Sequence, residues 1–129
     1  MTVFTELITL TGRHAALEPL SYEQENALTE AVRDGELWNL WYTAIPSPEG
    51  MRAEIERRLA LHKAGSMLPF AVLSRPGGKI VGMTTYMNID AKNRRVEIGS
   101  TWYAKSVQRT PLNTECKLML LTHAFETLA

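Results

Sequence analysis

The chain has 129 residues, a length that fits one domain and leaves no room for a second independent hydrophobic core. Hydrophobic residues make up 45% of the sequence and charged residues 22%, an ordinary globular composition that excludes a disordered or low-complexity chain. Because 14 Lys and Arg balance 14 Asp and Glu, no net positive field attracts a polyanion, and nucleic acid is not expected as the main partner.

The N-terminal third predicts one strand followed by one helix. Thr9 to Leu20 mixes apolar and polar residues and approaches its end with a proline, which is typical of an edge strand. Ser21 and Gln24 then have the spacing of a capping box. Apolar residues at helical spacing follow until Asp34-Gly35, so this segment predicts a first helix.

The next segment predicts a short helical turn and a second helix. Residues 36–42 are dense in aromatic side chains, and the run is too short for a long helix. Ser47-Pro48 supplies an N-cap and a first-turn proline, and Gly65 supplies a C-cap. Between them, apolar residues recur four positions apart at Met51, Ile55 and Leu59.

After this helix the period becomes that of strands. Leu68 to Ser74 and Ile80 to Asp90 flank a Pro-Gly-Gly turn and predict a hairpin, and Arg94 to Ala104 predicts a third antiparallel strand. Strict alternation would place Val96, Ile98, Ser100 and Trp102 on one face of that strand, and Glu97, Gly99, Thr101 and Tyr103 on the other.

A polar loop and an apolar helix end the sequence. Ser106 to Asn113 is polar, and Thr114 to Leu128 is apolar on more than one face. No internal repeat is visible, and the order of elements predicts an α+β fold with helices packed on a mostly antiparallel sheet.

The last strand, the loop and the helix suggest a place for a phosphate group. Strand, short loop and helix N-terminus in that order bring unpaired backbone amides and the positive end of a helix dipole together. Such a point can hold a pyrophosphate. The alternative is an ordinary helix start, because every strand-loop-helix junction makes one.

The segments Val96 to Tyr103 and Gln108 to Glu115 resemble motif A of the GNAT superfamily of acetyl-CoA-dependent N-acetyltransferases. In that family a Gln/Arg-x-x-Gly-x-Gly/Ala loop follows the fourth strand, and Gln108 matches its first position. The strand start Ile80-Val81-Gly82 and the opening Leu10 to Leu20 resemble the RimJ/RimL-like branch. The resemblance covers nearly the whole chain and implies a GNAT-like fold, acetyl-CoA as cosubstrate and an amine as acceptor.

Two residues depart from the family loop. Pro111 stands at the first glycine and removes one N–H, and Asn113 stands at the last small position. Pyrophosphate affinity would then be lower, or the loop would rely on Arg109, Thr110 and Thr114 instead. The cofactor contacts implied by the resemblance come from Trp102, Tyr103, Ala104, Gln108, Arg109, Thr110, Leu112, Asn113 and Thr114.

Acetyl transfer to an amine needs a general base, and Glu97 is the candidate. The alternative for Glu97 is a structural carboxylate paired with Arg94 or Arg95. Trp38 and Tyr42 belong to an aromatic cluster where the family places part of its acceptor wall.

Tyr86, on the middle strand, is a further candidate for the acceptor site. The alternatives are core packing for the aromatic cluster and cross-strand packing for Tyr86. A ribosomal-protein N-terminus, a small metabolite and a drug amine all remain open as acceptor.

Metal, disulfide and membrane functions are not expected. Cys116 is the one cysteine, and His14, His62 and His123 stand apart without ligand spacing, so we expect a buried inert thiol and no metal site. No apolar run approaches about 18 residues, and Met1 to Leu10 lacks the basic flank and apolar core of a leader, so we expect a cytoplasmic protein.

The GNAT fold continues beyond the helix that ends this sequence, so we expect residues 1–129 to form a single, incomplete domain, the N-terminal half to two-thirds of an acetyltransferase. The last helix is apolar nearly all round and the last strand lacks a neighbour on one side, which predicts a homodimer. The alternative function is a non-catalytic GNAT-like module that dimerises through its open sheet edge.

Overall fold

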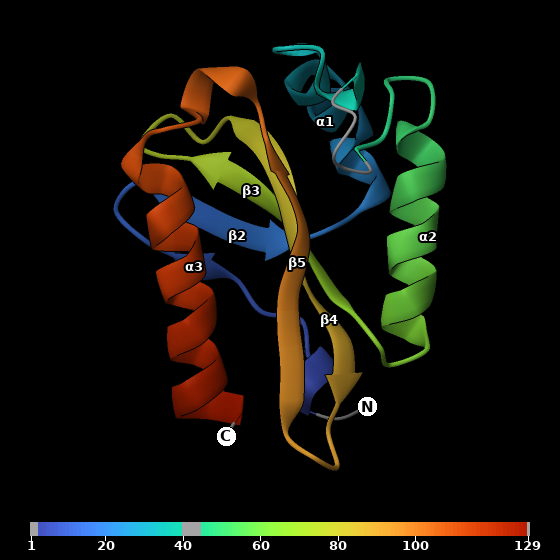
Figure 1. The fold of residues 1–129 in the computed structure, drawn as a ribbon, viewed down its shortest axis with the longest axis vertical. Coiled ribbons are helices and arrows are strands. Elements are labelled where there is room, and N and C mark those ends of the chain that lie inside the picture. Colours follow the sequence, from blue (N-terminus) through green and yellow to red (C-terminus); the bar gives the residue numbers. More distant parts are fainter. Residues whose placement is uncertain (1–2, 40–44, 129) are drawn as a thin grey trace.

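The computed structural model describes residues 3–39 and 45–128 and has three layers (Figure 1). A five-stranded antiparallel sheet with the order β1-β2-β3-β4-β5 forms the middle layer. Helices α1 (Glu25–Arg33) and α2 (Met51–Lys63) cover one face, and α3 (Pro111–His123) covers the other. The predicted α+β class and the antiparallel pairing are confirmed.

The predicted first strand is wrong, because that segment is a hairpin of two strands. β1 (Leu10–Thr11) pairs with β2 (Ala15–Pro19). Gly12 N–H donates to Ala15 O at 2.8 Å and closes the turn. On the other side of the turn, a carboxylate oxygen of Glu115 in α3 accepts from the amides of His14 and Ala15 at 2.6 and 2.8 Å. The turn is therefore fixed by a side chain about 100 residues away, which local sequence does not reveal.

The helices before the sheet start close to the predicted signals. Gln24 Oε1 accepts from Ser21 N–H at 2.9 Å, and a 3₁₀ turn over Tyr22–Gln24 leads into α1. Ser47 Oγ accepts from Gly50 N–H at 3.1 Å, and α2 begins one residue later. The predicted turn after α1 is present as a 3₁₀ turn over Leu37–Asn39, and residues 40–42 lie outside the described residues.

Strands β3 (Leu68–Ser74), β4 (Ile80–Asp90) and β5 (Arg95–Tyr103) form the predicted antiparallel meander. The predicted alternation along β5 is wrong after Gly99, because the strand has a bulge. Thr85 pairs with Gly99 and Met83 with Trp102, so three steps along β5 oppose two along β4. Ser100 takes φ 48° there, and the extra residue exchanges the faces of all later side chains.

The two faces of β4 and β5 can therefore be assigned from contacts. Tyr86 donates its hydroxyl hydrogen to Leu120 O, which places it on the α3 face. Met83 lies on the opposite face, beneath α1 and α2, together with its partner Trp102. The α1/α2 face of β5 thus carries Glu97, Gly99, Ser100 and Trp102, and the α3 face carries Val96, Ile98, Thr101 and Tyr103.

Helix α3 begins earlier than predicted. Thr110 is its N-cap and Pro111 its first residue, because proline has the right φ and lacks an N–H that would have no partner at that position. A π turn over Ala124–Leu128 continues the helix. The predicted polar loop therefore ends at residue 110.

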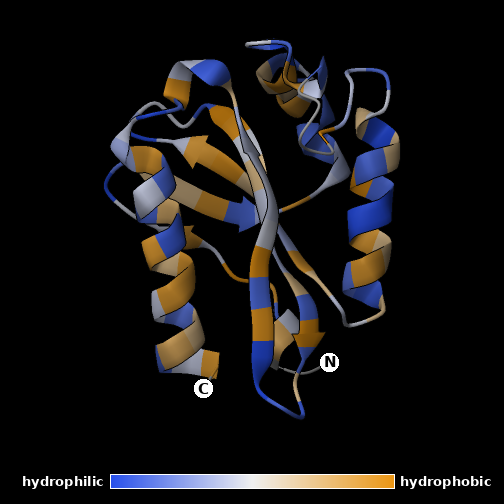
Figure 2. Ribbon diagram, viewed as in Figure 1, coloured by the Kyte–Doolittle hydropathy of each residue, from blue (hydrophilic) through white to orange (hydrophobic). Residues whose placement is uncertain are grey.

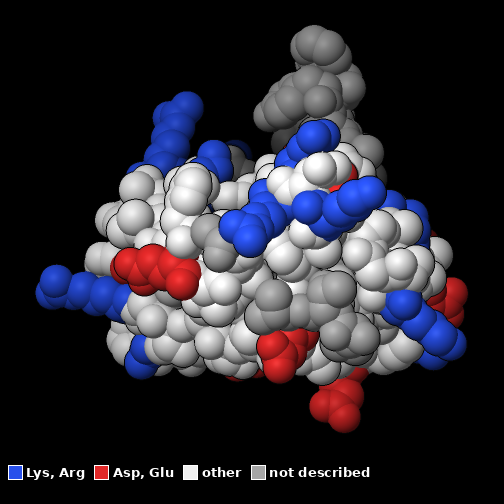
Figure 3. Space-filling view, turned by 90° about the horizontal axis from the view of Figure 1, so that it is seen from below, with Lys and Arg blue, Asp and Glu red and all other residues white. Residues whose placement is uncertain are grey.

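The core lies between the sheet and both helical layers, and hydrophobic residues dominate β2 and β3 and recur along α3 (Figure 2). Leu118, Leu121 and Phe125 of the last helical segment nevertheless stay exposed. On the face seen in Figure 3, basic and acidic side chains are interspersed, with uncharged areas between the groups. Within residues 3–39 and 45–128, no helix is long and apolar enough to cross a membrane.

Candidate functional site

The free edge of β5 leads directly into the predicted cofactor loop. Ala104 N–H donates to Val81 O at 2.7 Å, so this amide is already used within the sheet. The backbone groups of Tyr103, one residue earlier, point to the free edge because they alternate along a strand. Gln108 Nε2 donates to Tyr103 O at 3.0 Å and folds the start of the loop back onto the strand.

Asp34, at the end of α1, holds the loop between β5 and α3 in place through two hydrogen bonds. Asp34 O accepts from Lys105 N–H, and Asp34 Oδ2 accepts from Ser106 N–H, both at 3.1 Å. Hydrogen bonding from Ser106, the largest contribution, and the nearby charges of Lys79 and Lys105 lower the pKa of the Asp34 carboxyl. A residue from the other helical layer therefore fixes the loop.

The N-terminus of α3 presents the groups expected of an anion site. Arg109 has φ 64° and is exposed, and Thr110 Oγ1 donates to Val107 O at 2.6 Å. Thr110 Oγ1 also accepts from Leu112 N–H at 3.4 Å, a long contact. Asn113 Oδ1 is buried and has no partner in the described residues. A helix N-terminus carries partial positive charge, so this end of α3 can hold a phosphate.

Most of the predicted cofactor residues are thus brought to one corner of the molecule, where β5, the loop and α3 meet. Three of the predicted cofactor residues are exceptions by burial: Trp102, Ala104 and Leu112 are each 3% exposed and belong to the core. The amide of Ala104 also already has a partner. The edge residue Tyr103 and the exposed loop residues Gln108, Arg109, Thr110 and Thr114 are the accessible part of the predicted set.

Glu97 lies on the other side of the sheet from α3. Its side chain is exposed on the α1/α2 face, opposite Met87 of β4. Within the described residues, no ion pair joins Glu97 to Arg94 or Arg95, the structural alternative proposed from the sequence. The Glu97 carboxylate is therefore exposed and unpaired by any ion pair with the described residues.

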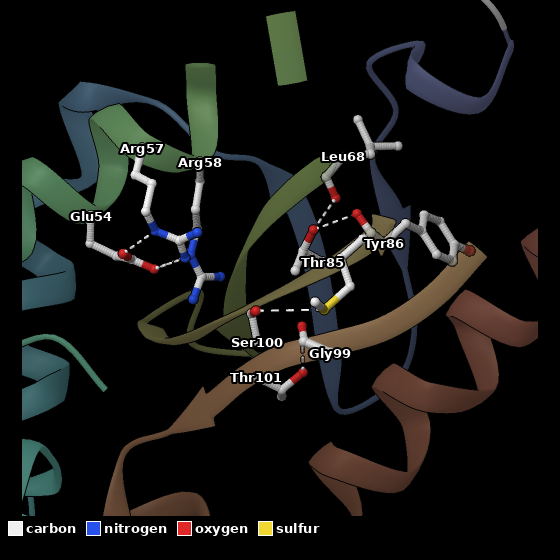
Figure 4. A network of polar contacts seen from close by, with 10 residues as sticks. Glu54, Arg57, Arg58, Leu68, Thr85, Tyr86, Gly99, Ser100 and Thr101 are labelled. Carbon is white, nitrogen blue, oxygen red and sulfur yellow. Dashed lines mark hydrogen bonds and ion pairs between the residues drawn. The ribbon is translucent and has the colours of Figure 1, made fainter. Parts of the chain in front are cut away.

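Sequence reasoning missed a charged cluster on α2 beneath the same face. Glu54 accepts from Arg57 Nε and Nη2, each at 2.8 Å, and from Arg58 Nε at 2.7 Å (Figure 4). Burial opposes ionisation of Glu54, but these hydrogen bonds outweigh it and lower its pKa. Arg58 is only 1% exposed. The missed signal was spacing, because Arg58 follows Met51 and Ile55 by seven and three residues, on the buried stripe of the helix.

Two of the three predicted acceptor residues, Tyr86 and Trp38, lie within the described residues, and both contribute to packing of the core. Tyr86 is 0% exposed, stacks on His123 and packs edge-on against Phe70, so it contributes to the core on the α3 face. Burial raises its pKa. Trp38 is half-buried and packs against the core, and Tyr42 lies outside the described residues.

The single cysteine sits in the core beside Tyr103. Burial raises the pKa of the Cys116 thiol to about 11 and also raises that of the Tyr103 hydroxyl. A thiol with so high a pKa is protonated at neutral pH and is a poor nucleophile. In the part of the chain that the structure describes, no group of three His, Cys, Asp or Glu side chains could hold a metal ion.

Comparisons with known proteins agree with this fold. A family model described as an acetyltransferase (GNAT) domain matches residues 15–129. The crystal structure of a GCN5-related N-acetyltransferase from Brucella melitensis is 27% identical with a TM-score of 0.79, over 95% of this chain and 57% of that one. The present chain thus spans less than two-thirds of that protein. No curated protein matches.

Two further solved structures share the fold at lower identity. The Salmonella typhimurium acetyltransferase that modifies the N-terminal serine of ribosomal protein L7/L12 is 18% identical with a TM-score of 0.74, over 90% of this chain and 67% of that one. RimL, a ribosomal L7/L12 α-N-protein acetyltransferase in complex with coenzyme A, is 20% identical with a TM-score of 0.71, over 92% and 67% of the two chains. At these identities the likeness shows the fold.

Proposed function

Because the chain belongs to the acetyltransferase (GNAT) domain family, we propose that its protein transfers an acetyl group from acetyl-CoA to a primary amine. One observation carries this proposal: the free edge of β5 runs through a short anchored loop into the N-terminus of α3. The same strand carries an exposed carboxylate, Glu97, six residues before the edge residue Tyr103. A coenzyme A complex of a protein with this fold supports the choice of cosubstrate.

In this proposal the corner at the start of α3 binds the pyrophosphate of acetyl-CoA. Arg109 supplies a positive charge and a planar set of donors, which suit a phosphate well. Pro111 has no N–H, so the main-chain amides of Arg109 and Thr110 and the exposed Thr114 take a larger share of the contacts. The backbone of Tyr103 at the free edge pairs with the pantetheine arm.

Glu97 is the proposed general base. It accepts a proton from the ammonium group of the acceptor, directly or through a water, which frees the nitrogen lone pair. The nitrogen attacks the thioester carbonyl carbon, and a backbone N–H stabilises the oxyanion that forms. The C–S bond then breaks, the acetyl group stays on nitrogen, and the second proton that the nitrogen loses is taken up by the CoA thiolate.

Calorimetry with acetyl-CoA tests the proposal against a non-catalytic module. Binding at micromolar ligand, followed by acetylation of an amine panel, supports the enzyme. A folded protein that gives no heat with acetyl-CoA supports a module that has lost the cosubstrate. Circular dichroism on the same sample shows that the protein is folded.

We also propose that the 129-residue chain forms a homodimer. A groove of about 380 Å³ runs between β5 and the last helical segment, with Val96, Ile98, Leu121, Ala124, Phe125 and Leu128 among its lining residues. Phe125 is 74% exposed beside it, and β5 has no neighbouring strand on its outer side among the described strands. An apolar groove beside an unpaired strand edge favours a second copy. Light scattering that finds a folded 14.5 kDa monomer at micromolar concentration would refute this.

A further inference from the structure

Arg58 of α2 is a buried cation with an unused donor group. Its Nε donates to Glu54, but its Nη1 is buried and has no partner within residues 3–39 and 45–128. Buried polar atoms without partners are rare in folded proteins, and arginine stays charged at any ordinary pH, so it cannot avoid the problem by losing a proton. An unpaired guanidinium donor in this position therefore points to a missing acceptor.

The carboxylate beside Arg58 does not supply that acceptor. Both oxygens of Glu54 already accept hydrogen bonds, two from Arg57 and one from Arg58. Two cations share this one carboxylate, so the cluster keeps a net positive charge. A second anion would complete it.

The neighbouring strand adds donors that also lack good acceptors. Figure 4 shows the Arg58 side chain reaching from α2 toward the part of β5 that holds Ser100. Ser100 Oγ donates only to the sulfur of Met87, at 3.6 Å, and a thioether is a weak acceptor. Trp102 Nε1, on the same face of β5, is buried without a partner in the described part of the chain. Within the part of the chain that the structure describes, these three donors have no oxygen acceptor for their hydrogens, so this face is suited to an anionic oxygen.

The position of these donors relates them to the proposed chemistry. Ser100 lies three residues from Glu97 on the same face of β5. An acceptor whose amine lies at Glu97 would place its neighbouring groups along this face. Because the thioether of Met87 is flexible, an incoming oxygen can replace it as the partner of Ser100.

We propose that Arg58 is a specificity-determining residue that binds a carboxylate of the acceptor, so that the preferred substrate is an amine carrying a carboxylate. This inference rests on the proposed acetyl transfer and names its substrate class. A free amino acid and a peptide with an acidic side chain close to its N-terminus share this chemistry. Arg58 Nη1 and Ser100 Oγ donate to the carboxylate, and Glu97 receives the proton of the amine.

The test compares probes that differ only in charge. The small probes are β-alanine and β-alaninamide, and the peptide probes are Ser-Asp-Gly-Gly amide and Ser-Asn-Gly-Gly amide. Binding to the full-length protein saturated with CoA is measured by calorimetry, and acetylation rates are measured separately with acetyl-CoA. We expect the carboxylate member of one pair to bind about 10-fold or more tightly than its amide, and the pair that shows this identifies the source.

The variants assign the preference to Arg58. Arg58→Met keeps an apolar stem without the charge and should remove the preference while affinity for acetyl-CoA stays unchanged. Arg57→Met removes the same charge from a side chain that is 52% exposed, and should keep the preference. If Arg58→Met does not fold, Ser100→Ala provides the second reading and should reduce the preference about 3-fold or more.

The outcomes separate the two proposals. A wild-type protein that binds acetyl-CoA but binds both members of each pair equally overturns the role of Arg58 and leaves acetyl transfer standing. A folded Arg58→Met variant, or a Ser100→Ala variant where the first does not fold, that keeps the full preference overturns it as well. A wild-type protein that does not bind acetyl-CoA contradicts the proposed function itself.

Discussion

The two faces of the sheet at β4 and β5 differ in how completely their buried side-chain donors are paired. On the α3 face, Tyr86 donates to Leu120 O, and the hydroxyls of Thr84 and Thr101 bond to each other at 2.8 Å. On the α1/α2 face, buried donors of Arg58 and Trp102 have no partner in the described structure. The buried hydroxyls on the α3 face are therefore paired within the core. The α1/α2 face has two buried donors that a further group could pair with.

This contrast distinguishes residues that stabilise the fold from residues that could bind a ligand. The third buried side-chain atom without a partner among the described residues is Asn113 Oδ1, at the start of α3. Two of the three unpaired atoms thus lie on the proposed acceptor face and one lies at the proposed pyrophosphate corner. Substitutions on the two faces should therefore differ in kind: those on the α3 face should change stability, and those at the site should change binding or rate.

The largest effect on stability is expected for a substitution on the α3 face. Leu120→Ala removes a fully buried side chain from α3 and leaves a cavity, which should lower the free energy of unfolding by about 2 to 5 kcal/mol. Urea unfolding followed by circular dichroism measures this. Leu118→Ala, at a position 62% exposed on the same helix, is the matched control and should change it by less than about 1 kcal/mol. Equal losses for both variants would contradict the assignment of faces.

A large effect on rate without an effect on stability is expected at Glu97. Glu97→Gln keeps the size of the exposed side chain but removes the base, so acetyl transfer should fall by roughly 100-fold or more. The pH–rate profile should also lose its acidic limb. Glu126→Gln, on the exposed surface of the last helical segment, is the matched control. A variant that keeps the shape and height of the wild-type profile would show that Glu97 is not the base.

The elements themselves were largely readable from the sequence, because hydrophobic period and turn residues are local signals. The hairpin of β3 and β4 and helix α2 follow directly from them. The bulge at Ser100 was not predictable in this way, since serine rarely adopts a positive φ and the neighbouring glycine is not the residue that does so.

The candidate site was predictable only in part, for a similar reason. Gln108 and Glu97 could be picked from a pattern and a resemblance, whereas Arg58 was not among the predicted site residues. Its burial depends on packing between α2 and the sheet and on its ion pair with Glu54, and neither follows from local sequence. The unpaired donor of Trp102 was also not predictable from the sequence, because the bulge determines which face of the sheet that side chain occupies.

A moderate effect on cosubstrate binding is expected at the start of α3. Arg109→Ala removes an exposed cation from the loop and should weaken acetyl-CoA binding by about 1 to 3 kcal/mol, measured by calorimetry. The free energy of unfolding should stay nearly constant, because Arg109 makes no ion pair with the described residues. Lys117→Ala, further along the same helix and also exposed, should bind acetyl-CoA like the wild type. Unchanged affinity in Arg109→Ala would remove this residue from the pyrophosphate site.

The smallest effect is expected at Asp34, at the end of α1, whose carboxylate accepts a hydrogen bond from Ser106 N–H in the loop between β5 and α3. Its pKa is lowered in the folded state, mainly by hydrogen bonding with Ser106, so the ionised form stabilises the fold. That contribution is present above the unfolded pKa, near 3.8, and is lost as the pH falls through the lower folded value. Because solvent screens this contact, Asp34→Asn should lower the free energy of unfolding at pH 7 by only about 0.5 to 1 kcal/mol. Urea unfolding of both proteins at pH 7 and pH 3 should show the difference shrinking toward zero at the lower pH. A difference that is the same at both pH values would mean that the charge of Asp34 does not anchor the loop.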